Sequence, residues 1–369
     1  MENIVEKNEQ GKVVIGLSGG VSSFIAAYLL KIQKYDLIGV TIVQKTNPDS
    51  RCFISDEDLA RIQDFCKRLN ISHITVDVDE IFTEKVQNHW VSHRLQLRPW
   101  NSSCFSCQNM RMEILYEKMR ELGAGYLSTG HFAKVFKTEE EVTVHSVHDL
   151  SLDQSHILHN LNRQILSSLL LPLSSLGSVE IEKLIRNFSL SSSLRSPFDC
   201  FKGDFSKEVL RKFSNFNVPG EIVLADGQKV GIHEGILKLE QGKEILANSH
   251  KVYISFKEGG SQNVVAEGEK FFVRNEVKLI DVVWSAMEEV STPFFAFLNH
   301  SSGSKKVKVY PKTLGTSIVE FSEATKLLPG ERVTLYKKKG GNAKIILSGM
   351  IEFSQSEDDK DTDSLEFLF

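Results

Sequence analysis

The feature that most constrains this chain is a short apolar run, a glycine-rich turn and a helical pattern in immediate succession near the N-terminus. Residues 12–17, Lys-Val-Val-Ile-Gly-Leu, have the composition of a buried strand, and Ser18-Gly19-Gly20 follows as a turn. From Val21 to Ile32 the apolar residues recur at helical spacing. Glycines and the N–H groups of a helix start can together surround a phosphate, so we predict an anion-binding loop. The alternative is a plain turn between a strand and a helix.

Strand and helix patterns continue to alternate through the first part of the chain. Strands are predicted at 36–43, 71–78 and 125–128, and helices at 56–69 and 110–122. This alternation favours an α/β fold with a doubly wound parallel sheet. After about residue 210, short β-rich runs take over, at 221–224, 251–256, 270–273, 277–283, 294–298, 306–310, 317–321, 332–337 and 343–353. They predict a small central β-rich domain over 209–275 and a C-terminal β-barrel with an acidic tail over 276–369, after a first domain of 1–208.

Composition narrows the class of protein. No run approaches the roughly 18 apolar residues of a membrane span, and the polar start at Met1–Gln10 is unlike a signal peptide, so we expect a cytoplasmic protein with no membrane partner. The formal net charge of −4 means that any nucleic-acid contact needs a local basic face. Two lysine groups could form one, or could simply be solvated: Lys305, Lys306, Lys308 and Lys312, and Lys337, Lys338 and Lys339.

Five cysteines are present, an odd number that argues against a disulfide framework. Cys104 and Cys107 form a CxxC pair, which we predict to lie on a loop just before the helix at 110–122, and Cys200 follows much later. A helix N-terminus favours the nucleophilic thiolate, so these three are candidates for chemistry. Cys52 and Cys66 are predicted to be structural thiols.

Several stretches, in the same order along the chain, resemble the motifs of one family, the tRNA-specific 2-thiouridylases of the MnmA type. The resemblance covers about residues 12 to 353. The stretches are 16–23 (the SGGxDS loop of PP-loop ATP pyrophosphatases), 104–107 (NPCxxCN), 122–133 (LGADYxATGHYA), 153–158 (KDQSYFL), 171–173 (LFPLG), 196–203 (SxGICFIGE), 219–223 (PGxIV) and 231–235 (GxHxG). Each motif alone is weak, but their shared order is specific.

The resemblance implies a PP-loop nucleotide-binding catalytic domain at 1–208 and a concrete reaction. ATP, with Mg²⁺, adenylates O2 of the wobble uridine (U34) in tRNAs of the Lys, Glu and Gln type. A persulfide on Cys200, filled by a sulfur-donor protein of a persulfide relay, delivers sulfur. Cys107 attacks or helps to release sulfide, and a disulfide with Cys200 can form. Two cysteines are needed because one carries the sulfur and the other accepts the resulting S–S bond.

The same resemblance assigns the binding residues. It implies nucleotide contacts from Gly16, Leu17, Ser18, Gly19, Gly20, Val21, Ser22, Ser23, Ile42 and Gly130. It implies tRNA contacts from Asn101, Ser102, Ser103, Asp153 and Gln154. It assigns no protein ligand to a metal ion.

The chain also departs from the family pattern. Ser22 stands where the loop has an aspartate that is tied to Mg²⁺–pyrophosphate handling, Asn101-Ser102-Ser103 replaces Asn-Pro-Asp or Asn-Pro-Cys, and Leu152 replaces lysine. Two alternative readings follow. One is a tRNA thiolase in which Cys104, Cys107 and Cys200 hold a [4Fe-4S] cluster. The other is a tRNA- or nucleotide-binding paralogue that has lost catalysis.

Overall fold

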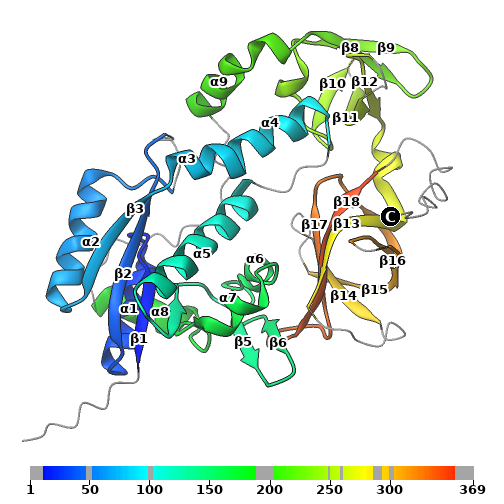
Figure 1. Ribbon diagram of the computed structural model, residues 1–369. Helices are drawn as coiled ribbons and strands as arrows, with labels where there is room; N and C mark the ends of the chain where they lie inside the picture. The colour runs from blue at the N-terminus through cyan, green and yellow to red at the C-terminus, as the bar shows by residue number, and fades with distance from the viewer. Residues whose placement is uncertain are drawn as a thin grey trace, which may run out of the picture.

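The described part of the chain contains three main β-structures, which follow one another, and a small two-stranded sheet of β5 (Lys134–Lys137) and β6 (Val142–His145) (Figure 1). The computed structural model describes residues 11–46, 52–98, 103–187, 203–247, 250–257, 261–285, 293–298, 303–313 and 315–353. The acidic tail predicted after Phe353 lies outside these ranges. None of the helices that the structure describes is long and apolar enough to cross a membrane.

The first structure is a five-stranded sheet in which all strands are parallel, in the order β3-β2-β1-β4-β7. Its strands are β1 (Lys12–Gly16), β2 (Asp36–Val43), β3 (Ser72–Asp77), β4 (Tyr126–Ser128) and β7 (Leu169–Leu170). The main helices around it are α1 (Val21–Ile32), α2 (Asp56–Arg68), α5 (Ser103–Glu121), α7 (Arg163–Ser168) and α8 (Ser178–Asn187).

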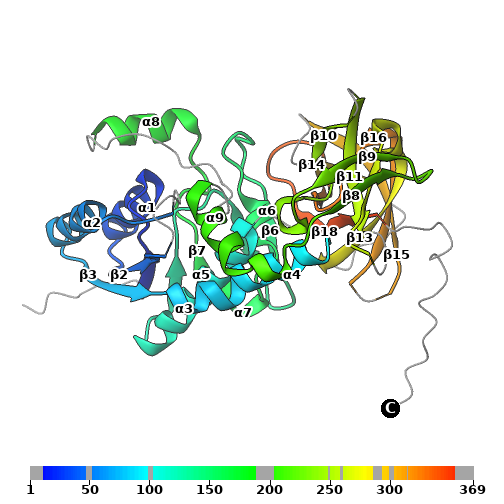
Figure 2. The same cartoon turned by 90° about the horizontal axis from the view of Figure 1, so that it is seen from above.

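Alternation of side chains along β1 explains why helices cover both faces of this sheet. Val13 and Ile15 point into one core together with residues of α1, α2 and α8, whereas Val14 points into another with residues of α5 and α7. Figure 2 shows these two helix layers on opposite sides of the strands. The predicted doubly wound parallel sheet is therefore confirmed.

A helical segment links this sheet to the second β-structure. It consists of α3 (Asp79–Phe82), a π-helical turn η1 (Thr83–Gln87) and α4 (Asn88–Leu95). The Arg94 guanidinium at its end donates to the carbonyl of Leu239 and pairs with the Glu240 carboxylate at 3.2 Å. Sequence patterns missed this segment, which follows β3 directly and has no Gly or Pro at its start.

The second structure is a five-stranded sheet in the order β10-β11-β12-β8-β9. Only the β12–β8 pair is parallel. Its strands are β8 (Gly220–Leu224), β9 (Lys229–His233), β10 (Glu244–Ala247), β11 (His250–Lys257) and β12 (Val264–Glu267), with α9 (Gly203–Lys212), η2 (Ser214–Phe216) and η3 (Ile236–Lys238) beside them. Gly227, with φ of 83°, closes the β8–β9 hairpin in a conformation that favours glycine.

The third structure is a closed antiparallel barrel in the order β13-β16-β15-β14-β17-β18. Its strands are β13 (Val273–Trp284), β14 (Phe294–Leu298), β15 (Ser304–Pro311), β16 (Ser317–Lys326), β17 (Arg332–Tyr336) and β18 (Ile345–Glu352). The predicted barrel is confirmed, but the strand predicted at 270–273 is wrong. Residues Glu269–Phe272 form a 3-10 turn, η4, because this turn buries the Phe272 ring in the barrel core beside Phe353.

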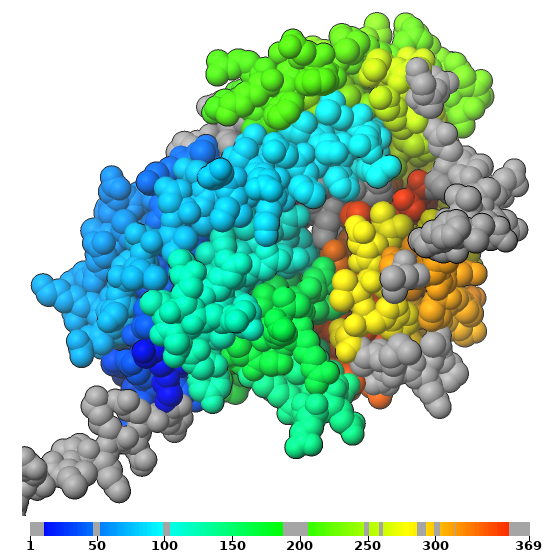
Figure 3. Space-filling model, viewed as in Figure 1, coloured from blue at the N-terminus to red at the C-terminus, as the bar shows by residue number. Residues whose placement is uncertain are grey.

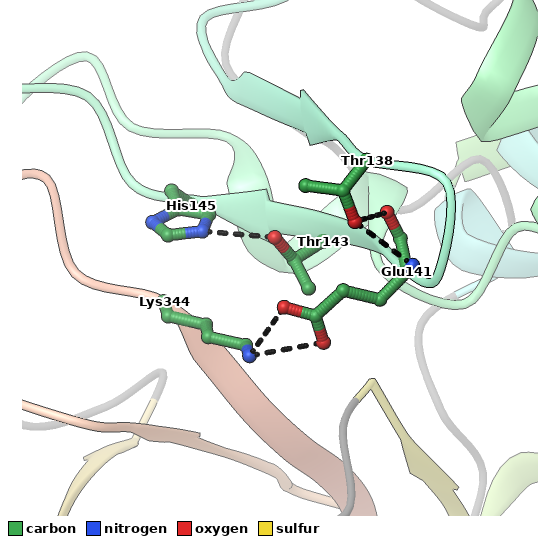
Figure 4. Close-up of polar contacts among 5 residues, drawn as sticks. All are labelled: Thr138, Glu141, Thr143, His145 and Lys344. Carbon is green, nitrogen blue, oxygen red and sulfur yellow. Dashed lines mark hydrogen bonds and ion pairs between the residues drawn. The ribbon is translucent and has the colours of Figure 1, made fainter.

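The barrel contacts the first domain through a hairpin and a short helix. The hairpin consists of β5 (Lys134–Lys137) and β6 (Val142–His145), and α6 (Ser155–Leu158) follows it. Lys344 lies just before β18. Its Nζ donates hydrogen bonds to both carboxylate oxygens of Glu141 at the hairpin turn, at 3.1 and 3.2 Å (Figure 4). Figure 3 shows the green surface around α6 and α7 meeting the yellow and orange surface of the barrel. The domain limits at 1–208, 209–275 and 276–369 remain a proposal.

Candidate active site

The predicted phosphate loop connects the end of β1 to the start of α1. Gly19 adopts a left-handed backbone with φ of 71°, and Gly20 precedes the first turn of α1 without a side-chain cap. The hydroxyl of Ser23 donates to the carbonyl of Gly20 at 2.7 Å, and the N–H of Leu17 donates to the carbonyl of Val40 at 2.8 Å. The loop is thus held from both ends, while the first N–H groups of α1 have no partner within the helix. This is the geometry that binds a phosphate.

Gly130 lies directly against this loop, although it follows a different strand. A Cβ atom built on Gly130 would stand 2.6 Å from the carbonyl carbon of Ser22 and 2.7 Å from the backbone nitrogen of Ser23. Only glycine fits this approach of two backbones. The structure therefore brings Gly130 together with the loop, as expected for residues that share a nucleotide. Ile42, in contrast, is buried in the core on the α5 side, so its predicted nucleotide contact stays a prediction.

The CxxC pair lies inside a helix, which corrects the prediction of a loop. Helix α5 begins at Ser103, so Cys104 and Cys107 belong to its first two turns and share one face at i, i+3 spacing. The helix begins early because Phe105 and Cys107 themselves are buried and give the first turn an apolar side. Cys107 is 5% exposed and Cys104 is half-buried. The Nε–H of Arg111, one turn further on, donates to Cys107 Sγ at 3.3 Å.

Residues of the barrel reach the start of α5. The guanidinium of Arg332 on β17 lies 4.5 Å from the ring centre of Phe105, which stands between the two cysteines. The His156 ring of α6 lies 6.3 Å from the same ring and 6.4 Å from Phe297 on β14. Residues of α6 and of the barrel thus pack around Phe105 in the first turns of α5. Sequence reasoning missed Arg332 and His156, because nothing local in the chain signals a contact between such distant segments.

Asp153 and Gln154, the predicted tRNA contacts, have internal partners. The Asp153 carboxylate accepts from Ser155 Oγ at 2.7 Å and from the Tyr336 hydroxyl of the barrel at 3.4 Å, and its burial raises the carboxyl pKa. Gln154 Oε1 accepts from the N–H of Phe132 at 3.1 Å. In this structure Asp153 contacts the barrel and Gln154 contacts the segment after β4, and their contact with tRNA stays a prediction.

Several predicted site residues lie outside the described ranges. These are Asn101, Ser102 and Cys200; Ser103 begins α5, but its side chain is likewise not described. The pairing of Cys107 with Cys200 therefore stays a prediction, and so does a cluster on Cys104, Cys107 and Cys200. Within the described ranges, no three His, Cys, Asp or Glu side chains are grouped so as to hold a metal ion.

A buried histidine at the α6–barrel junction predicts acid sensitivity. Burial and the nearby Arg332 charge lower the pKa of His159 to about 3, and the ring contacts Ser348 Oγ at 2.7 Å and Ser285 Oγ at 3.3 Å. Below the unfolded pKa of about 6.5 the unfolded chain binds a proton that the folded chain excludes. The free energy of unfolding should therefore fall by about 2 kcal/mol between pH 6.5 and 4.5 through this residue alone. Urea unfolding at several pH values measures it.

The variant His159→Gln serves as the reference for that measurement, because it removes the titrating group. Its free energy of unfolding should depend less steeply on pH over the same interval. Equal slopes for the two proteins would contradict the assignment.

Comparison with known proteins identifies the family. Residues 11–197 match the family model described as the tRNA methyl transferase HUP domain. The tRNA-specific 2-thiouridylase MnmA 2 of Thermoanaerobacter sp. (strain X514) is 30% identical over 359 residues, which cover 89% of this chain and 95% of that protein. The chain belongs to the MnmA-type tRNA-specific 2-thiouridylase family. The MnmA protein of Shouchella clausii is 26% identical over 90% of this chain and 95% of its own length.

Solved structures match more weakly than these MnmA-type relatives. The U34-tRNA thiolase NcsA from Methanococcus maripaludis, with its [4Fe-4S] cluster, aligns over 56% of this chain and 65% of its own, at 20% identity and a TM-score of 0.35. A likeness at this level does not bear on individual residues of the site.

Proposed function

We propose that this protein is a tRNA-uridine 2-sulfurtransferase that thiolates the wobble uridine U34 in an ATP-dependent reaction. The observation that carries the proposal is that, in a chain of this family, the phosphate loop and the buried thiol of Cys107 are both supported by the same parallel sheet. The phosphate loop backed by Gly130 lies at the end of β1, and the buried thiol of Cys107 lies in the first turns of α5, which packs on the same strand.

The phosphate loop supports the activation step. The first N–H groups of α1 and the backbone at Gly19 and Gly20 would hold the ATP phosphates, and the helix dipole favours their negative charge. Activation is needed because a carbonyl oxygen is a poor leaving group. Once O2 of the uridine attacks the α-phosphate, pyrophosphate leaves, and O2 can later depart from C2 as AMP.

The cysteines support the sulfur step. The terminal sulfur of a persulfide on Cys200 ends up on C2 of the uridine, either by direct attack or as sulfide released by Cys107. In both routes the thiols of Cys107 and Cys200 are oxidised to a disulfide while the transferred sulfur is reduced, so electrons balance. An external dithiol must then reduce this disulfide before the next turnover. We propose tRNAs of the Lys, Glu and Gln type, a persulfide-carrying donor protein and a cytoplasmic location.

The serine at position 22 predicts that the phosphate loop contributes little to Mg²⁺ binding. The loop over residues 16–23 contains no Asp or Glu, so the loop itself supplies no carboxylate for a magnesium ion on the phosphates. Ser22→Asp should lower the Mg²⁺ concentration needed for half-maximal pyrophosphate release roughly tenfold, because it adds a negative charge next to the ion. The neutral variant Ser22→Asn is the matched control and should leave it unchanged. An unchanged Mg²⁺ requirement in Ser22→Asp would contradict this prediction.

The proposed function is tested by thiolation of unmodified tRNA. Pure protein is incubated with ATP, Mg²⁺, a persulfide-carrying sulfur donor, a dithiol and tRNA for Lys, Glu or Gln, and the RNA is run on a mercury-containing gel that retards thiolated RNA. An authentic thiouridylase provides the positive control. Retarded tRNA supports the proposal. If none appears beside a working control, anaerobic repetition with reconstituted iron and sulfide distinguishes a cluster-dependent enzyme from a protein that only binds, and either outcome overturns the persulfide mechanism.

A further inference from the structure

The sulfur of Cys107 has a cationic partner from its own helix. Arg111 lies four residues later on α5, so both side chains project from the same face. The guanidinium Nε–H donates to Cys107 Sγ at 3.3 Å, and this contact is part-buried.

Because Cys107 is buried among apolar side chains, a nearby cation has a large effect on the stability of its thiolate. The thiol is 5% exposed and belongs to an apolar cluster that includes Met110, Ile114 and Leu158. Removing a thiolate from water is unfavourable unless an opposite charge compensates. An arginine remains protonated at any physiological pH and is weakly hydrated, so it can approach a buried anion.

Other charged or titratable groups in the described part of the chain also lie near the start of α5. Cys104 lies on the same helix, His156 comes from α6 and Arg332 from β17, and these last two lie beside the Phe105 ring. Lys85 of η1 pairs with Glu113 at 2.9 Å, on the part of α5 beyond Arg111. Arg111, in contrast, donates directly to the sulfur of Cys107.

We propose that Arg111 binds the thiolate of Cys107 and thereby keeps this buried sulfur reactive at neutral pH. The thiol proton is released to solvent, and the guanidinium retains its own protons throughout. This role deepens the proposed function, on which it rests, because it prepares Cys107 for its attack on the persulfide. Because Arg111 and Cys107 are in contact in the free protein, their interaction can be measured without tRNA or ATP.

The test is the rate of alkylation of Cys107 by iodoacetamide as a function of pH, followed by mass spectrometry of its peptide. In Arg111→Met the rate of Cys107 alkylation at pH 7 should fall about tenfold or more, because the buried sulfur loses its cationic partner. Arg111→Lys should recover part of the rate, because it restores a cation. Arg120→Met makes the same exchange at an exposed position near the end of α5 and should match the wild type.

Cys66 provides an internal reference that requires no variant. It is 2% exposed, and burial raises the pKa of its thiol to about 11. In the wild-type protein Cys107 should therefore be alkylated much faster than Cys66 at pH 7, even if Arg111→Met fails to fold. Profiles of Cys107 that coincide in the wild type and Arg111→Met, or that coincide with Cys66, would overturn the proposal. Absence of tRNA thiolation with a normal Cys107 profile would instead count against the proposed function alone.

Discussion

Replacing Cys107 by serine should abolish tRNA thiolation, with a loss of at least about 1000-fold in rate. A serine hydroxyl is a much weaker nucleophile than a thiolate, and it cannot form the disulfide that balances the release of sulfide. The exchange is nearly isosteric and lies within α5, so binding of ATP at the phosphate loop should persist. The mercury gel reports thiolation, and calorimetric titration with ATP reports binding.

Two further cysteine variants sharpen this result. Cys52→Ser removes an exposed thiol and should leave thiolation unchanged. Cys104→Ser should also retain thiolation if the persulfide mechanism holds, whereas a cluster bound by Cys104, Cys107 and Cys200 would lose it. Thiolation by Cys107→Ser close to the wild-type rate would refute the assigned role.

Replacing Gly130 by alanine should disrupt the phosphate loop. The added Cβ would stand within 2.6 to 2.8 Å of three backbone atoms of Ser22 and Ser23, which cannot rotate away as a flexible side chain could. The start of α1 or the turn after β4 must therefore move. We expect ATP affinity to fall at least about tenfold and the free energy of unfolding to fall by about 1–3 kcal/mol, as for other overpacked sites.

A matched glycine, Gly125, lies at the opposite end of β4, just before its first residue. A Cβ on Gly125 would meet no atom within 4 Å, so Gly125→Ala should leave ATP affinity unchanged. Calorimetric titration with ATP and thermal unfolding of both variants measure the two effects. If Gly130→Ala bound ATP like the wild type, the close approach of these two backbones would not matter for the nucleotide.

Local patterns predicted the elements whose formation depends on neighbours in the chain. The bounds predicted for α1, β2 and β14 coincide with the structure, since each has a complete apolar period and clear punctuation at its ends. The start of α5 was misplaced, because the residues from Ser103 to Asn109 carry few apolar side chains and no conventional cap signal. Its first turns are stabilised by the burial of Phe105 and Cys107 in the folded protein.

The sequence by itself determined the strand–loop–helix that can hold phosphate and the family to which the chain belongs, because both depend on residues close together in the chain or on motifs in a fixed order. Only the tertiary structure decided which distant segments meet at the start of α5 and at the phosphate loop. Arg332 meets Phe105, and Gly130 meets Ser22, through contacts between distant segments that no local period encodes. Such contacts arise when the apolar faces of the sheet, α5 and the barrel are buried together, so packing selects them after local structure has formed.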